Sequence, residues 1–259
     1  MEQRVVLKNL EGETLVGAFH KINDKKKVVI VCHGFTGNKD RDFVKEFCLS
    51  LNREGVNAFR FDFSGNGESE GRFEDAIYSK EISDLKCVVD YFSKMSFAVG
   101  LIGHSMGGTV CLMETSLDPR IKFLVSISGV THTATYRQKF VKLYAKNEKE
   151  FDDSMRQNSS YEFYSEQNKT WYTVSSGYFA DIIRHNPVDA VKNIKVPVLF
   201  VHGDADDRID IQETKDVYKV ANEPKKMFTI KGADHRFTDK DVFNRMVKRV
   251  IAWVKENLQ

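Results

Sequence analysis

The chain has 259 residues, and its 39 basic and 37 acidic side chains give a formal net charge of only +2. No basic tract interleaved with aromatic residues stands out, so the composition gives no support to nucleic-acid binding. A hydrophobic content of 41% is ample for a buried core, and the length suits one large α/β domain or two small ones.

Targeting signals and metal-binding patterns are not evident. The N-terminal residues lack the apolar core of a signal peptide, and no apolar run approaches the roughly 20 residues of a membrane span. The cysteines form neither a C-x-x-C pair nor a zinc spacing, and they are Cys32, Cys48, Cys87 and Cys111. Three of them lie in apolar patterns, where a free thiol behaves as a small hydrophobic side chain. We therefore expect a cytoplasmic protein with reduced cysteines, no metal and no stable membrane insertion.

Strand and helix patterns alternate through the first half of the chain. Residues 4–7 and 14–19 flank a Glu-Gly-Glu turn and are predicted to form a hairpin. The apolar run 28–32 is typical of a strand buried on both faces. Helix, strand, helix, strand, helix and strand patterns then follow at residues 43–53, 56–63, 76–92, 97–102, 109–117 and 121–127. This order predicts a mostly parallel sheet covered by helices, with a ligand crevice at the carboxyl ends of the strands.

A sharp turn between a predicted strand and a predicted helix is the most informative stretch. Its sequence is Gly103-His104-Ser105-Met106-Gly107, which has the pattern Gly-x-Ser-x-Gly. The serine of such a turn sits at the apex in a strained conformation, and the glycines avoid collisions across the turn. The Met106 N–H, at the start of the helix, points where an oxyanion would develop. We therefore predict that Ser105 is a catalytic nucleophile.

The alternation breaks after residue 128, and we interpret residues 129–186 as a cap inserted over the crevice of a single domain spanning residues 1–259. Aromatic residues at positions 136, 140 and 144 line one face of a predicted helix. A hairpin at 161–175 and a short helix at 178–185 are predicted to follow. Most aromatic side chains should pack the cap onto the domain, and some should line a pocket for an apolar or aryl substrate with a polar end. The candidates for substrate contact are Tyr136, Phe140, Tyr164, Trp171 and Tyr172.

The regular pattern returns with elements at 196–201, 212–221, 226–230 and 241–258. A serine hydroxyl needs a base to take its proton, and the base needs a buried carboxylate to fix its tautomer. His235 follows the last strand and is predicted to be the base, and an aspartate cluster follows the strand before it. Within that cluster Asp206 has the reach toward a neighbouring loop. Asp204 is the next choice, but it directly follows Gly203, where a short carboxylate often caps a turn, and Asp207 is predicted to be solvated.

The six remaining histidines are predicted to have structural roles. Three lie outside the crevice loops and are expected at the surface or in the cap: His20, His132 and His185. Two end strands and are expected to hydrogen-bond to neighbouring loops: His33 and His202. The side chain of His104 should point away from that of Ser105.

Five motifs together resemble the α/β-hydrolase superfamily, and they begin at His33-Gly34-Phe35, Asp62-Phe63-Ser64-Gly65, Gly103-His104-Ser105, His202-Gly203-Asp204 and Gly232-Ala233-Asp234-His235. The chain is most similar to the intracellular cinnamoyl and feruloyl esterases and to the monoacylglycerol-lipase and lysophospholipase-like enzymes. The resemblance implies the α/β-hydrolase fold, a mostly parallel central sheet flanked by helices with an inserted cap. It also implies that the Phe35 N–H joins that of Met106 in the oxyanion hole, and that the acid is Asp206. The cap matches no pattern of the family.

These observations predict a serine carboxylesterase that hydrolyses short-chain acyl or hydroxycinnamoyl esters through an acyl-enzyme, without a cofactor. One alternative is a monoacylglycerol lipase or lysophospholipase, whose cap should offer a long aliphatic tunnel rather than tyrosines and polar residues. Another is a homologue that binds a small ligand without turnover, which a complete set of catalytic residues disfavours. The expected partner is a small-molecule ester, and the protein is expected to be a monomer or a homodimer.

Overall fold

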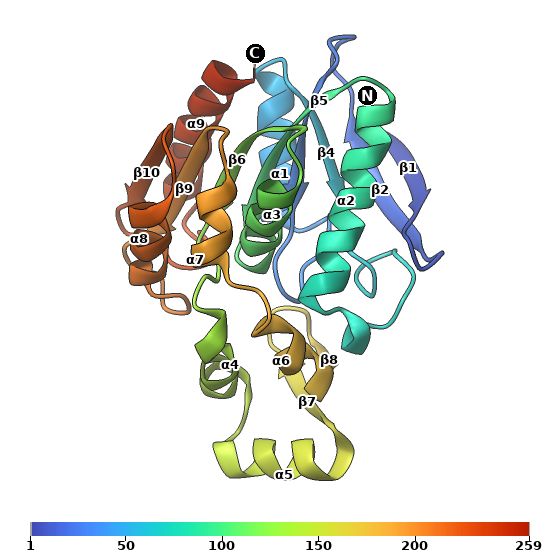
Figure 1. The fold of residues 1–259 in the computed structure, drawn as a ribbon, viewed down its shortest axis with the longest axis vertical. Helices are drawn as coiled ribbons and strands as arrows, with labels where there is room; N and C mark the ends of the chain where they lie inside the picture. The colour runs from blue at the N-terminus through green and yellow to red at the C-terminus, as the bar shows by residue number, and fades with distance from the viewer. Residues whose placement is uncertain (1, 259) are drawn as a thin grey trace.

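The computed structural model describes residues 2–258, and an eight-stranded sheet forms its centre (Figure 1). In sheet order its strands are β1 (Glu2–Lys8), β2 (Thr14–His20), β4 (Asn57–Phe61), β3 (Lys27–Cys32), β5 (Ala98–His104), β6 (Ile121–Ile127), β9 (Val198–Gly203) and β10 (Lys225–Ile230). Strands β1, β2 and β4 pair antiparallel, and every pair from β4 to β10 is parallel. The predicted mostly parallel sheet with an N-terminal hairpin is confirmed.

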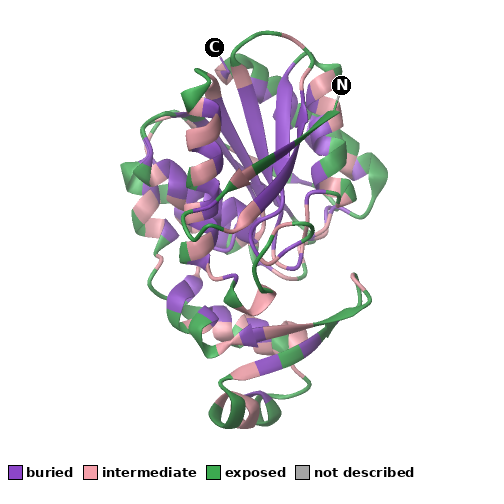
Figure 2. Cartoon of the chain, turned by 90° about the vertical axis from the view of Figure 1, so that its right-hand side faces the viewer, coloured by how far each residue is buried: buried purple, intermediate pink, exposed green. Residues whose placement is uncertain are grey.

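Helices cover both faces of this sheet (Figure 1). One face is covered by α1 (Asp42–Arg53) and α9 (Lys240–Asn257), and the other by α2 (Tyr78–Lys94), α3 (Met106–Leu117) and α8 (Ile211–Val220). Strand β3 shows why the central strands have continuously apolar sequences rather than alternating ones. Its Val28 and Ile30 pack on the α2 and α3 side, whereas Val29 and Val31 pack on the α1 and α9 side. Because side chains of a strand alternate between the faces, a strand covered on both sides needs apolar residues throughout. Figure 2 shows the central strands largely buried between the helices, whereas the edge strand β1 and the outer surfaces of the helices carry exposed residues.

Between β6 and β9 the chain leaves the sheet and forms a separate group of elements beyond the carboxyl end of β6 (Figure 1). These are η2 (Thr133–Thr135), α4 (Tyr136–Tyr144), α5 (Glu148–Asn158), the antiparallel strands β7 (Ser160–Ser165) and β8 (Thr170–Ser175), and α6 (Ser176–Ile182). We call residues 129–186 the insert. The chain then returns through α7 (Pro187–Ala190) and η3 (Val191–Asn193), which pack against α3.

Hydrogen bonds connect the insert to loops at the carboxyl edge of the sheet. The side chain of Asn168, in the β7–β8 turn, donates to the Thr36 carbonyl oxygen at 2.7 Å. At the other end of this hairpin, Ser175 Oγ donates to the carbonyl oxygen of Glu74 at 3.0 Å, in η1 (Phe73–Asp75). The insert is therefore attached to the loop that follows β3 and to the turn that precedes α2.

Helix α5 was not predicted, because its sequence is almost entirely polar and only Phe151 is buried. Its start is nevertheless encoded locally, since the Asn147 side chain caps the helix by accepting from the N–H of Glu150. Among residues 2–258 no helix is long and apolar enough to cross a membrane. Within the same residues no group of three or more His, Cys, Asp or Glu side chains is placed to hold a metal ion.

Candidate active site

Ser105 occupies the turn between β5 and α3 in a strained backbone conformation. Its φ of 55° and ψ of −123° lie where residues other than glycine are rare. A Cβ on Gly103 would lie 2.1 Å from the Gly107 carbonyl oxygen, so this glycine permits the tight turn. A Cβ on Gly107 would lie 2.3 Å from the carbonyl oxygen of His33. His33 directly follows β3 and is not part of the serine turn. Gly107 therefore permits the close approach of the loop that follows β3.

The side chains of Ser105, His235 and Asp206 form a continuous hydrogen-bonded line. His235 Nε2 lies 3.0 Å from Ser105 Oγ, and His235 Nδ1 lies 2.9 Å from Asp206 Oδ2. His235 follows β10 and Asp206 follows β9, so three loops at one edge of the sheet supply the three groups. Because a carboxylate only accepts, Nδ1 carries the proton and Nε2 is free to take one from the serine hydroxyl.

Asp206 is held as an ionised, buried acceptor. Its Oδ1 accepts the backbone N–H groups of Arg208 at 3.0 Å and Ile209 at 2.9 Å. Burial alone would raise the pKa of this carboxyl, but hydrogen bonds from His202 and His235 outweigh it and hold the pKa far below its ordinary value. The other candidate acid, Asp204, is exposed and accepts the N–H of Gly232 at 2.6 Å. Asp204 thus has the turn-capping contact that its position predicts, and it is not in contact with His235.

Two further histidines, His104 and His202, hold the loops that carry this line. Each donates a hydrogen bond to a backbone carbonyl oxygen of one of these loops. His104 donates from Nε2 to the carbonyl oxygen of His235 at 2.8 Å, and its ring stacks on Phe43. Burial and the neighbouring His235 lower the pKa of His104 to about 3, so its ring is neutral. His202 Nε2 lies 2.9 Å from the Ile209 carbonyl oxygen and 3.3 Å from Asp206 Oδ2.

The sequence predicts that His202 contacts a neighbouring loop, and the structure bears this out. The sequence alone does not reveal that this loop is the one bearing Asp206, because that depends on the path of the chain between residues 206 and 209. The hydroxyl of Thr214 lies 2.7 Å from His202 Nδ1. Because the Ile209 carbonyl oxygen can only accept, His202 carries its proton on Nε2, and the Thr214 hydroxyl donates to Nδ1.

The loop that follows β3 lies directly against Ser105. A Cβ on Gly34 would be 3.0 Å from Ser105 Cβ and 3.6 Å from its Oγ. The next residue in this loop is Phe35, and Met106 is the first residue of α3. The N–H of a first helical residue has no acceptor within the helix, so it can bind an external anion. The two amides predicted for an oxyanion hole therefore belong to segments that flank the serine side chain.

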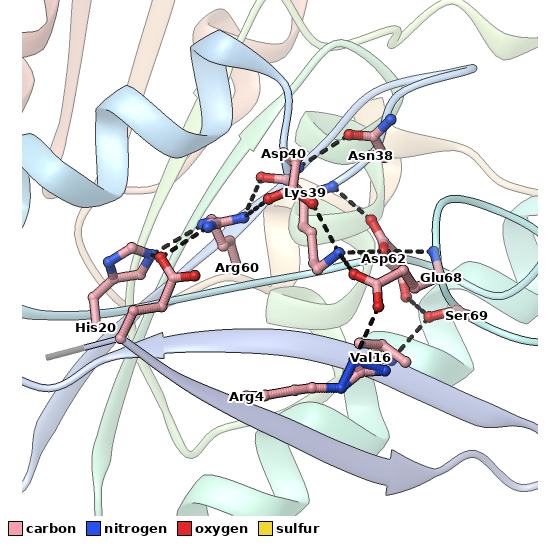
Figure 3. Close-up of polar contacts among 11 residues, drawn as sticks. Arg4, Val16, His20, Asn38, Lys39, Asp40, Arg60, Asp62, Glu68 and Ser69 are labelled. Carbon is pink, nitrogen blue, oxygen red and sulfur yellow. Dashed lines mark hydrogen bonds and ion pairs between the residues drawn. The ribbon is translucent and has the colours of Figure 1, made fainter.

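A buried polar network holds the far end of this loop (Figure 3). The fully buried Asp62 accepts the backbone N–H of Lys39 at 2.6 Å and that of Glu68 at 2.9 Å. The Lys39 ammonium pairs with Asp62 at 3.2 Å and closely with Glu68. Burial opposes the charge of Lys39, but the acidic partners Glu68, Asp40 and Asp62 raise its pKa above the ordinary value. The loop from Gly34 to Lys39 is thereby fixed to the turn that follows β4.

Arg60 extends the same network, and it corrects one prediction about histidines. The Arg60 guanidinium is almost completely buried and donates to the Lys39 carbonyl oxygen at 3.0 Å and to His20 Nε2 at 2.9 Å. His20 was predicted to lie at the surface or in the cap, but it is only 2% exposed. A position outside the crevice loops does not make a side chain exposed, because here the His20 ring is covered by Arg60, which contacts it from the neighbouring strand β4.

The ring of Phe35 enters an aromatic cluster formed by the insert. It stacks on Phe163 with ring centroids 5.7 Å apart, and its centroid is 5.8 Å from that of Tyr144. Three of the five residues predicted to contact substrate belong to this cluster. The Phe140 ring centroid lies 6.2 Å from that of Phe35, and the Tyr172 centroid lies 5.8 Å from that of Phe163. The Tyr136 ring reaches the cluster through Tyr178, whose centroid is 6.0 Å from that of Tyr136 and 5.6 Å from that of Phe35.

The other two predicted contact residues lie on the opposite face of the β7–β8 hairpin. Tyr164 and Trp171 are cross-strand partners whose ring centroids are 5.4 Å apart, and they are 38% and 67% exposed. Their neighbours in the strand, including the buried Phe163, point into the aromatic cluster. Because strand side chains alternate, Tyr164 and Trp171 point away from it. Their predicted role in substrate contact has no support in this arrangement.

Comparison with known proteins agrees with this arrangement. A family model described as serine aminopeptidase, S33, matches residues 23–241. The chain belongs to this family. It is 25% identical over 232 residues to the human mitochondrial palmitoyl-protein thioesterase ABHD10. The matched region covers 86% of this chain and 71% of that protein.

Two solved structures illustrate the shared fold. Est1E from Butyrivibrio proteoclasticus, solved with ferulic acid bound, is 24% identical with a TM-score of 0.82 over 98% of both chains. The Pyrococcus furiosus esterase Pf2001 is 21% identical with a TM-score of 0.77, over 100% of this chain and 91% of that one. At these identities the likeness shows the fold, which is the α/β-hydrolase fold predicted from the motifs. Family membership and the thioesterase relative support hydrolysis of an ester-type bond as the general activity.

Proposed function

We propose that the protein is a serine esterase that works through an acyl-enzyme, with Ser105 as nucleophile, His235 as base and Asp206 as the acid that orients it. The observation that carries the proposal is the hydrogen-bonded line from Asp206 Oδ2 through His235 to Ser105 Oγ, with contacts of 2.9 and 3.0 Å. Nucleophile and base within hydrogen-bond reach, with the base oriented by a third group, are the signature of an activated hydroxyl.

The mechanism follows from which atoms can donate and accept. Ser105 Oγ attacks the ester carbonyl carbon as its proton passes to His235 Nε2, and the N–H groups of Phe35 and Met106 hold the oxyanion. His235 then returns the proton to the leaving alcohol, and the acyl group remains on Ser105. A water molecule attacks this acyl-enzyme with the same base and releases the acid. Asp206 stays ionised throughout and stabilises the imidazolium.

We further propose that residues 129–186 act as a cap over the site, within a single domain, and that the acyl group is short or hydroxycinnamoyl. The aromatic cluster around Phe35 is closely packed, since Phe140 and Phe163 are almost completely buried. A compact or planar acyl group fits such surroundings better than an extended alkyl chain. The palmitoyl thioesterase relative favours a second candidate, hydrolysis of a long-chain thioester or ester by the same residues.

Steady-state kinetics with matched substrates separate these candidates. We expect p-nitrophenyl acetate and butyrate, or methyl ferulate, to give a higher kcat/KM than p-nitrophenyl decanoate and palmitoyl thioesters. Highest turnover on decanoyl or palmitoyl substrates would select the lipase or thioesterase candidate instead. Ser105→Ala is the control, and its rate should fall by a factor of about 10⁴ or more. Turnover that survives in Ser105→Ala would reject the acyl-enzyme mechanism.

A further inference from the structure

Three of the four loops around the candidate site, all except the turn of Ser105, carry an arginine in or next to the loop. Arg41 follows the loop of Phe35, Arg208 lies two residues after Asp206, and Arg236 directly follows His235. All three side chains are partly buried. The motifs of the sequence do not include them, and the mechanism proposed above does not use their guanidinium groups.

Contacts place two of these guanidinium groups beside the residues that flank Ser105. Arg208 Nη1 donates to the hydroxyl of Tyr144 at 3.1 Å, and the Tyr144 ring lies 5.8 Å from that of Phe35. Arg41 Nη2 lies 3.4 Å from the carbonyl oxygen of Thr36, the residue after Phe35. Asn168 of the insert donates to this same carbonyl oxygen. Arg41 and Arg208 therefore lie where the site loops meet the insert.

No carboxylate neutralises the three arginines at short range. Within residues 2–258, no carboxylate oxygen lies within 4.0 Å of any of their guanidinium nitrogens. By contrast, the structural arginines Arg60, Arg120 and Arg137 each pair with acidic side chains. Asp207 and Asp234 attract Arg236 only from a longer distance, and Asp234 is occupied by hydrogen bonds from Thr238.

The arginines also repel one another. Burial, followed by the charge of Arg208, lowers the pKa of Arg236 below the ordinary value. Burial also lowers the pKa of Arg41, and Arg236 contributes to this effect. Asp42 attracts Arg41, as Asp207 and Asp234 attract Arg236, but none of these aspartates forms an ion pair with its arginine. Partly buried like charges that lack an ion-pair partner are unfavourable, and an anion bound between them relieves both the repulsion and the lost hydration. Guanidinium groups are moreover suited to bidentate binding of carboxylate and phosphate.

We propose that Arg41, Arg208 and Arg236 form an anion-binding rim, and that the substrate is an ester or thioester bearing a carboxylate or phosphate group. This inference rests on the proposed function, because the rim is assigned to the substrate of Ser105. It narrows the substrate class to molecules with an anionic end and an apolar body that meets the aromatic cluster. The same positive rim disfavours a free α-amine, so it opposes the aminopeptidase activity that the family description carries.

The test compares each anionic substrate with a neutral substrate of similar shape; the carboxylate adds one negative charge and the phosphate nearly two at pH 7. On the acyl side, p-nitrophenyl hemiglutarate is matched with p-nitrophenyl valerate, which has a methyl group in place of the carboxylate. On the leaving-group side, 2-acetoxyethyl phosphate is matched with 2-methoxyethyl acetate. We expect the anionic member of one pair to be preferred by about tenfold or more in kcat/KM, mainly through a lower KM. A preference in the first pair supports binding of an acyl-side carboxylate, and a preference in the second pair supports binding of a phosphate on the leaving group.

The variant Arg208→Gln/Arg236→Gln should reduce this preference to about threefold or less, mostly by raising KM for the anionic substrate. Arg53→Gln is the matched control, because Arg53 is exposed at the distant end of α1, and it should keep the full preference. Raising the salt concentration should also weaken the preference, since the Debye length falls from about 10 Å at 0.1 M to about 3 Å at 1 M. Reaction with a fluorophosphonate checks that the double variant is folded with a reactive serine.

The outcomes distinguish the rim from the function on which it rests. If neutral esters are hydrolysed and neither anionic substrate is preferred, or the double variant keeps the preference, the rim is refuted and the esterase stands. If no ester of either kind is hydrolysed and no fluorophosphonate reacts, the proposed function itself has failed.

Discussion

Replacement of Asp206 by asparagine tests the hydrogen-bonded line at its acidic end, where the carboxylate is buried. Asp206 Oδ1 accepts two backbone N–H groups, so the amide oxygen of the asparagine takes this position. Its NH₂ group then faces His235 Nδ1 and His202 Nε2, where the carboxylate had an acceptor. An NH₂ group can only donate, so His235 must accept at Nδ1 and carry its proton on Nε2. In that tautomer it cannot take the proton of Ser105.

The size of the loss follows from this change of tautomer and from the missing negative charge. An amide in place of the acid of a serine triad lowers kcat by about 10⁴. At about 1.36 kcal/mol for each factor of ten, this corresponds to about 5 kcal/mol of activation free energy. We also expect a smaller free energy of unfolding, because the depressed pKa of Asp206 means that its ionised form stabilises the fold. That difference should be complete above about pH 5 and should shrink as the pH falls further.

The assay is the steady-state hydrolysis of p-nitrophenyl acetate at pH 7, together with thermal unfolding from pH 3 to pH 8. Asp204→Asn is the matched control, because Asp204 is exposed and its asparagine can still accept the N–H of Gly232. It should keep kcat within about threefold, as a surface substitution that preserves its hydrogen bond. The reasoning is refuted if Asp206→Asn keeps a tenth or more of the activity, or if Asp204→Asn loses as much as Asp206→Asn does.

Three further predictions concern groups around the site. Gly107→Ala places a Cβ 2.3 Å from the His33 carbonyl oxygen, so it should displace the loop that follows β3, which carries the proposed oxyanion donor Phe35. We expect kcat to fall by about 10²–10³, whereas an unchanged kcat would contradict the close packing. His202→Ala removes the single Nε2–H that donates to the Ile209 carbonyl oxygen and lies 3.3 Å from Asp206 Oδ2. It should reduce the free energy of unfolding by about 1–3 kcal/mol in urea titrations and lower kcat. The Glu81 carboxyl is buried, and among residues 2–258 neither of its oxygens has a partner; burial, reinforced by Asp84, raises its pKa. Glu81→Met should therefore raise the free energy of unfolding by about 1–3 kcal/mol at pH 7. It should also reduce the loss of stability as the pH rises above the ordinary carboxyl pKa, and equal pH slopes for both proteins would contradict this.

The sequence predicts the main elements well because each carries a local signal. Strands such as β3 are continuously apolar, and Gly103 marks a tight turn, where a Cβ would lie 2.1 Å from the Gly107 carbonyl oxygen. The order of serine, acid and histidine along the chain predicts which loops must meet at the edge of the sheet. The line from Ser105 to Asp206 then follows from the fold that these elements form, and its distances agree with that expectation.

What the sequence does not reveal depends on contacts between distant segments. The outward orientation of Trp171 follows from the register of the β7–β8 hairpin, which places Phe163 rather than Tyr164 in the aromatic cluster. The burial of His20 depends on Arg60, forty residues away, and on the network around Lys39. The arginine rim is equally hidden, because Arg41, Arg208 and Arg236 share no spacing. Only the meeting of three loops brings them together.

The most direct test of the central claim is to find which residue reacts with a fluorophosphonate, by mass spectrometry of the digested full-length protein. A hydroxyl activated by the His235 imidazole should be phosphonylated at Ser105 alone, rapidly in the native protein and at a greatly reduced rate in His235→Ala. Labelling elsewhere, or labelling of Ser105 that is equally fast without His235, would contradict the assignment of the nucleophile and its base.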